Sequence, residues 1–157
     1  MRGDPAVIEA LNGILTAELS GINQYFIHAK MCRNWGLLRL AKHNRDESVD
    51  EMKHADSVIE RILFLDGVPN MQRLGPVRVG ETVAEQFKLD LALELDAVKR
   101  YNDAIALCTQ RNDAGTRELL EDLLGGEEDS VDWHEAQVGL LEKIGVERYL
   151  AEQLKES

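Results

Sequence analysis

Two segments of this chain carry glutamates and a histidine at a repeated spacing, and these residue types bind metal ions. The candidate ligands are Glu18, Glu51, His54, Glu94 and Glu127. In each segment the two glutamates are 33 residues apart, and Glu51 opens an E-x-x-H motif that ends at His54. Two helical hairpins with carboxylates at matching depth can enclose two metal ions inside a four-helix bundle. The spacing therefore predicts a buried two-metal site.

The glutamates fall on apolar helical stripes. At about 100° per residue, Glu51 and His54 are only ~60° apart around a helix. Three apolar positions lie within roughly 40° of Glu51 by the same count, and these are Ala55, Val58 and Ile62. The Glu51 side chain is therefore expected to point toward the hydrophobic core.

Glu94 lies between Leu91 and Leu95 on a similar stripe, and Glu18 has apolar neighbours at comparable spacing. Burying an ionised carboxylate is unfavourable unless it is paired or binds a metal ion. Alternatively, each glutamate is a surface residue whose side chain reaches outward to water. This alternative is a poor explanation for four glutamates on four core stripes. Oxygen ligands with one imidazole favour iron or manganese, and ferrous ions held there could reduce O₂ or peroxide.

Helical periodicity predicts an all-α chain with four long helices. The first helix is expected from residue 5 to about 34, and the second from the break at 35–36 to a glycine stop at 66–69. The third is expected from a capping box at 82–85 to a turn at 112–113, and the fourth from that turn to 144. The long connection over residues 68–80 implies two antiparallel hairpins joined by one crossover. We expect a single domain over 1–157, with a four-helix bundle over about 5–144 and a short C-terminal fifth helix over about 146–155.

Composition narrows the function classes. A chain of 157 residues with a formal charge of −11 fits one domain, and its charge argues against nucleic acid and anionic membranes as partners. The N-terminal residues do not resemble a signal peptide, and no apolar run is long enough to span a bilayer. Cys32 and Cys108 form no disulfide framework or C-x-x-C motif. The expected location is the cytoplasm.

The sequence resembles the bacterioferritin family over essentially its whole length. The matching stretches are LSGINQYF (19–26), DEMKHAD (50–56), ERILFL (60–65), DLALELD (90–96) and VDW (131–133). The resemblance implies a ferritin-like fold and a hollow shell of 24 subunits, built from dimers that share haem b. Such a shell oxidises Fe²⁺ at a di-iron centre, stores a ferric mineral and accepts electrons for iron release from a ferredoxin-like reductant.

The resemblance also assigns roles to the candidate ligands. Glu51 and Glu127 would bridge the two irons, with Glu18 and His54 on one iron and Glu94 on the other. Ser130 departs from the family, because a second histidine ligand belongs at that position. This change predicts a weakened second iron position, completed by water.

Two further features near Ser130 bear on that position. His134 is about 10.5 Å further along the helix axis than Glu127 and is too far away to replace the missing ligand. Gly125 and Gly126 lie in mid-helix, where each glycine costs up to ~1 kcal/mol relative to alanine.

Outside the di-iron residues, Met52 has the strongest implied role. Spacing alone favours an interface residue, because Met52 lies with Val49, Ile59 and Leu63 on a second apolar flank. The resemblance makes it an axial ligand of haem iron, one from each of two subunits. Asp46, Asp50 and Ser130 are accessory metal candidates. The two aspartates could serve iron transfer or nucleation, with solvated helix charges as the alternative. His28 and His43 have no partners at ligand spacing, and no role beyond packing or surface is expected for them.

Two functions therefore stay open. The first is an iron-storage subunit with ferroxidase activity that Ser130 reduces. The second is a ferroxidase-defective, haem-carrying structural subunit that works in mixed cages with an active ferritin-type partner subunit. A rubrerythrin-like peroxidase lacks support because no second C-x-x-C domain follows. A dodecameric mini-ferritin is disfavoured because the ligands lie within one bundle and a fifth helix is expected.

Overall fold

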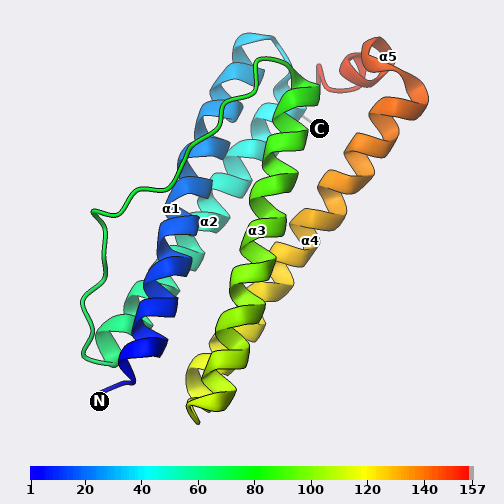
Figure 1. Cartoon of the computed structure of the whole chain (residues 1–157). Helices are drawn as coiled ribbons and strands as arrows, with labels where there is room; N and C mark the ends of the chain where they lie inside the picture. The colour runs from blue at the N-terminus through cyan, green and yellow to red at the C-terminus, as the bar shows by residue number, and fades with distance from the viewer. Residues whose placement is uncertain (156–157) are drawn as a thin grey trace.

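Four long helices run side by side, and a short fifth helix lies at one end (Figure 1). The computed structural model describes residues 1–155. Its helices are α1 (Pro5–Asn34), α2 (Leu38–Phe64), α3 (Val83–Gln110), α4 (Ala114–Ile144) and α5 (Val146–Ala151). The hairpins α1–α2 and α3–α4 are each antiparallel, and the connection from α2 to α3 returns along the length of the bundle beside α1 (Figure 1). The predicted all-α bundle with one long crossover is confirmed.

Local capping explains where the helices begin. The Asp4 side chain accepts a hydrogen bond from the Ala6 N–H at 2.7 Å, with Pro5 in the first helical position. Thr82 caps α3 by accepting from the Glu85 N–H at 3.2 Å. The Glu85 carboxylate accepts from the Glu81 N–H, one residue before the position that a standard capping box uses.

The C-terminal helix is shorter than predicted. It ends at Ala151 instead of near residue 155, and turns follow. Tyr149 anchors α5 by burying its ring against Phe87, and the Arg39 N–H donates to the Gln153 carbonyl at 3.0 Å. Periodicity alone could not show this end, because contacts with α2 and α3 hold the segment in place. Residues 156–157 of the expected domain lie outside the described part of the chain.

The core consists of two apolar clusters with a polar layer between them. One cluster includes Leu11, Val58 and Leu120 from three helices, and the other includes Leu40 and Phe87 at the end near α5. The buried polar side chains of the layer are Glu18, Gln24, His28, Glu51, Asp90, Glu94, Glu127, Ser130 and His134. So much buried charge in mid-bundle requires partners or bound cations.

One expectation about a single residue was wrong, and another residue packs through more specific contacts than expected. Leu95 does not flank Glu94 in the core, because its side chain is 51% exposed, and the buried positions around Glu94 are Asp90 and Ala97. His28 has a specific role in the fold. Its Nδ1 lies 2.9 Å from Asp90 Oδ1, and its Nε2 accepts a hydrogen bond from the Gly80 N–H at 3.0 Å. His28 thus joins α1, α3 and the crossover.

Within residues 1–155, no helix combines the length and the apolar character that crossing a bilayer requires.

Candidate metal centre

Each of the four bundle helices contributes to the polar layer. Glu18 comes from α1, Glu51 and His54 from α2, Glu94 from α3 and Glu127 from α4. The four glutamates are between 1% and 4% exposed. His54 is less deeply buried, with 17% of its side chain exposed. The structure therefore gathers in one layer five residues that are up to 109 positions apart in sequence.

The first group of possible ligands joins three helices. One ligand atom each from Glu18, Glu51, His54 and Glu127 lies within 4.8 Å of the others. Nδ1 of His54 is 2.9 Å from Oε1 of Glu127 and 3.6 Å from Oε2 of Glu18. Ligands of one metal ion at about 2.0–2.2 Å are at most ~4.4 Å apart, so little movement would bring these atoms onto one cation.

The second group contains a residue that the sequence analysis missed. Glu47, Glu51 and Glu94 also place one oxygen each within 4.8 Å of one another. Glu51 belongs to both groups, so its position suits a bridging ligand. Glu47 precedes Glu51 by four residues and thus lies on the same face of α2. That spacing was the available signal, but the nearby charged residues of α2 made it ambiguous.

Two tyrosines orient the outer carboxylates. The Tyr101 hydroxyl donates to Oε1 of Glu18 at 2.6 Å, and the Tyr25 hydroxyl donates to Oε1 of Glu94 at 2.6 Å. The other oxygen of each carboxylate, Oε2, is buried and has no hydrogen-bond partner among residues 1–155. Oε2 of Glu127 is in the same state. Buried polar atoms are nearly always partnered, so these oxygens fit a bound cation.

Protons hold the site together when no metal is bound. Burial, followed by repulsion from Glu18, raises the pKa of Glu51 well above its usual value. Burial raises the pKa of Glu18 as well, but its interactions with the neighbouring Glu51 and His54 outweigh burial and lower that pKa overall. Burial and the neighbouring Glu127 raise the pKa of Glu94 well above its usual value. The clustered carboxylates cannot all ionise without cations.

His54 supplies one of those cations. Burial lowers the pKa of His54, but the hydrogen bond to Glu127 and the nearby carboxylate of Glu18 raise it to about 10. Metal binding would displace the proton from the imidazole and from the carboxylates. The donor set of carboxylates and one imidazole fits iron or manganese rather than a metal that prefers thiolate.

Gly126 makes room for His54. A Cβ atom at Gly126 would lie 3.3 Å from Cε1 and 3.4 Å from Nε2 of His54, closer than most Cβ contacts. At Gly125, in contrast, no neighbouring side chain among residues 1–155 comes within 4 Å, and nothing in the structure explains that glycine. The close approach of α2 and α4 at Gly126 therefore accounts for one of the two mid-helix glycines.

Ser130 and His134 take part in the layer without joining either ligand group. The Ser130 hydroxyl donates to Oε2 of Glu47 at 3.0 Å. Nδ1 of His134 donates to the Ser130 carbonyl at 2.7 Å, and its ring lies between Tyr25 and Trp133. His43, which also approaches this region, stacks on Trp133, and burial lowers its pKa to about 3.

The remaining candidates lie on the surface. Met52 is 49% exposed, and its neighbour Val49 is 38% exposed. Asp46 is exposed and pairs with Lys42 at 2.8 Å, and Asp50 lies 3.9 Å from Lys53. Neither aspartate belongs to the two ligand groups, so their accessory roles stay predictions.

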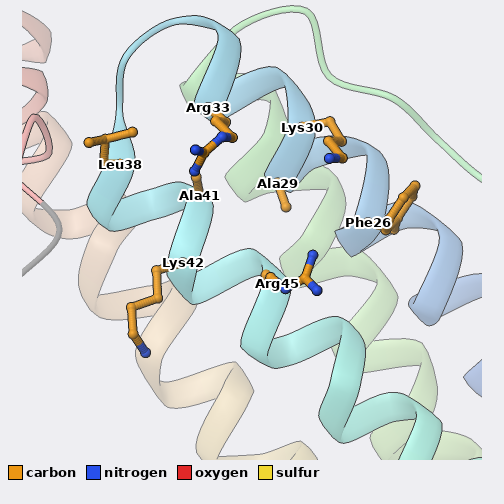
Figure 2. Close-up of a pocket in the computed structure, with 8 residues that line it drawn as sticks. All are labelled: Phe26, Ala29, Lys30, Arg33, Leu38, Ala41, Lys42 and Arg45. Atoms are coloured by element: carbon orange, nitrogen blue, oxygen red, sulfur yellow. The ribbon is translucent and has the colours of Figure 1, made fainter.

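A basic pocket lies away from the metal ligands, where α1 ends and α2 begins (Figure 2). Its volume is about 410 Å³. Lys30 and Arg33 reach it from α1, and Lys42 and Arg45 reach it from α2 (Figure 2). Phe26 forms part of its apolar wall. This pocket concentrates positive charge on a molecule of strongly negative net charge.

The bundle, its crossover and the buried carboxylate layer define a ferritin-like protein, and the description "Ferritin-like domain" matches residues 8–144. A bacterioferritin of Mycolicibacterium paratuberculosis is 49% identical over 97% of this chain and 96% of its own length. Bacterioferritins of Streptomyces coelicolor (46% identical, 100% and 94% covered) and Brucella melitensis (44% identical, 95% and 92% covered) are also similar. The chain belongs to the bacterioferritin family.

Proposed function

We propose that this protein is an iron-storage subunit that oxidises Fe²⁺ at a di-iron centre inside its bundle. The observation that carries the proposal is the buried layer of four glutamates and His54, drawn from all four helices around Glu51. Membership of the bacterioferritin family supports iron as the metal. Two Fe²⁺ ions each give one electron. Either O₂ accepts both with two protons to form H₂O₂, or H₂O₂ accepts both with two protons to form two waters.

The chain's own residues prepare the site for that reaction. Tyr101 and Tyr25 hold one oxygen of Glu18 and Glu94, which leaves the other oxygen of each free to bind iron. Glu51 contributes to both ligand groups and would bridge the two irons, together with Glu127. Hard anionic oxygens favour the ferric over the ferrous ion, so the carboxylates assist the loss of electrons.

Stopped-flow absorbance of the full-length homopolymer tests the activity. We expect rapid formation of a ferric absorbance after Fe²⁺ and O₂ are mixed with the wild type, and loss of that phase in Glu51→Gln. Glu60→Gln is the matched control, because Glu60 is exposed on the same helix. Equal rates in wild type and Glu51→Gln would exclude oxidation at this centre.

Ser130 favours the second candidate function, which is a ferroxidase-defective subunit of a mixed cage. Rapid oxidation by the pure homopolymer would exclude that function.

Haem b between paired subunits is the second part of the proposal. Arg45, Val49 and Met52 follow one another at spacings of four and three residues and so share one face of α2. Met52 offers an exposed thioether, Val49 offers apolar surface, and Arg45 lines the basic pocket of Figure 2. A thioether ligand suits ferrous haem, and cations suit the two haem carboxylates. Met52→Ala should purify with little haem, whereas Met71→Ala in the crossover should keep it. Unchanged haem content in Met52→Ala would exclude the role.

A shell of 24 subunits, with a ferredoxin-like reductant for iron release, completes the proposal. Large apolar side chains are exposed on the isolated subunit, among them Leu63 (57%), Phe64 (46%) and Leu140 (44%). Such surface is typical of interfaces between subunits. Cys32 and Cys108 are buried free thiols, which is consistent with the reducing cytoplasm as the proposed location. Native mass spectrometry would show the subunit number, and a stable monomer would contradict the shell.

A further inference from the structure

We infer that Glu47 binds the second metal ion in this chain, in place of the histidine that Ser130 replaces. This inference rests on the proposed function, because it assigns a ligand within the same two-metal centre. Glu47 and Glu51 of α2 and Glu94 of α3 each place one oxygen within 4.8 Å of the others. The second metal position is then completed by a carboxylate and not by water.

An independent observation points to a cation at this group. Glu94 is only 1% exposed, and its Oε2 has no hydrogen-bond partner among residues 1–155. Tyr25 already holds Oε1 of the same carboxylate at 2.6 Å. A buried carboxylate oxygen without a donor is rare unless a ligand completes the site. A metal ion between Glu94, Glu51 and Glu47 would satisfy that oxygen.

Ser130 positions Glu47. Its hydroxyl donates to Oε2 of Glu47 at 3.0 Å, across 83 residues of sequence. Oε1 of Glu47 is 3.7 Å from Nε2 of His43, which is beyond hydrogen-bond distance. One oxygen is therefore held and the other can turn toward a metal. A serine side chain is smaller than an imidazole ring, and the Glu47 carboxylate approaches this small side chain to hydrogen-bond distance. The serine thus directs a different ligand into the second position.

The exchange alters the charge of the centre. A neutral imidazole would be replaced by an anion, which brings the carboxylates around the two metals to five: Glu18, Glu47, Glu51, Glu94 and Glu127. Two ferrous ions carry four positive charges and two ferric ions carry six. Five carboxylates therefore balance the ferric pair better than four do. The second position should hold its ion more firmly after oxidation than a water-completed position would.

Titration of the assembled apo-protein with Co²⁺, followed by its visible absorbance, tests the ligand without any oxidation step. The wild type should bind two equivalents per subunit. Glu47→Gln should keep one equivalent and bind the second at least about tenfold more weakly, because it loses an anionic ligand. Glu60→Gln, the same change at an exposed position of the same helix, should bind both. Ser130→His should restore the second equivalent in the Glu47→Gln background.

The outcomes separate this inference from the proposed function. Two tight equivalents in Glu47→Gln, or only one in the wild type, would overturn the role of Glu47 while the first metal position stands. No binding in the wild type would overturn the proposed function itself. If Glu47→Gln does not fold, an anomalous difference map of Co²⁺-loaded wild type decides. A second cobalt within about 2.0–2.2 Å of Glu47 supports the inference, and a cobalt without that contact overturns it.

Discussion

Nδ1 of His54 lies 2.9 Å from Oε1 of Glu127, and this contact joins the α1–α2 hairpin to the α3–α4 hairpin at the level of the metal centre. Glu18 and Tyr101 make a second connection between the hairpins, at 2.6 Å. The residues that would bind metal are therefore also residues that hold the two halves of the bundle together. Metal binding and bundle stability are coupled for this reason.

Metal loading should raise the thermal midpoint of the protein. A ligand that binds only the folded state stabilises it by about 2.7 kcal/mol at a free concentration of 100 times Kd. Differential scanning calorimetry of apo and Co²⁺-loaded protein measures the shift. Glu51→Gln removes the ligand shared by both groups and should abolish most of the increase in thermal midpoint. An unchanged increase would show that the metal binds elsewhere.

The apo-protein should lose stability as pH rises from about 6.5 to 10. The pKa of His54 is raised in the folded state to about 10, because the hydrogen bond to Glu127 and the nearby carboxylate of Glu18 outweigh burial. The folded protein therefore binds this proton more tightly than the unfolded chain does. The stabilisation is complete below pH 6.5 and is lost as pH rises through 10. Thermal melts across this range should show the decline in wild type and a flatter profile in His54→Gln.

The same protons should weaken metal binding at low pH. The pKa values of Glu51 and Glu94 are raised by burial and by neighbouring carboxylates, so these groups retain protons that a metal must displace. Co²⁺ affinity should increase with pH, and each binding event should release protons that a weakly buffered titration can count. Binding without proton release would contradict the assignment of these ligands.

Alanine should impair function at one of the two mid-helix glycines and not at the other. Gly125→Ala meets no neighbouring side chain and should stabilise α4 by up to ~1 kcal/mol. Gly126→Ala places a Cβ atom 3.3 Å from the His54 ring, so the ring must shift. We expect Gly126→Ala to weaken metal binding and slow Fe²⁺ oxidation, while Gly125→Ala leaves both unchanged. Equal behaviour of the two variants would show that the contact with His54 is unimportant.

Loss of Asp90 should destabilise the bundle. Its Oδ1 accepts from the Gln24 side chain at 2.8 Å and from His28 at 2.9 Å, all within the buried layer. Hydrogen bonds to a charged group contribute about 1.5–3 kcal/mol each, so Asp90→Ala should lower the free energy of unfolding by at least one such increment. Asp103→Ala is the control on the same helix, because its ion pair with Lys99 is exposed to water and contributes little to stability. Chemical denaturation compares them.

The order of the helices, the crossover and the residues that face the core could be predicted from the sequence. Periodicity and capping residues are local properties, so they determine where a helix begins and which of its faces is apolar. Glu18, Glu51 and Glu127 were recognisable because they interrupt apolar stripes at a repeated spacing. The end of α5 was not predictable in this way, because contacts of Tyr149 and Gln153 with other helices decide it.

Which residues meet across the helices was decided only by the tertiary structure. The sequence places Glu47 on the face of α2 that carries Glu51, but nothing local shows that Ser130 of α4 holds it there. The pairing of His28 with Asp90 likewise depends on the crossing of α1 and α3. Helical spacing specifies the direction of a side chain from its own helix axis. The partner it finds depends on how neighbouring helices are rotated and how deeply they are placed, and packing of the whole bundle determines both.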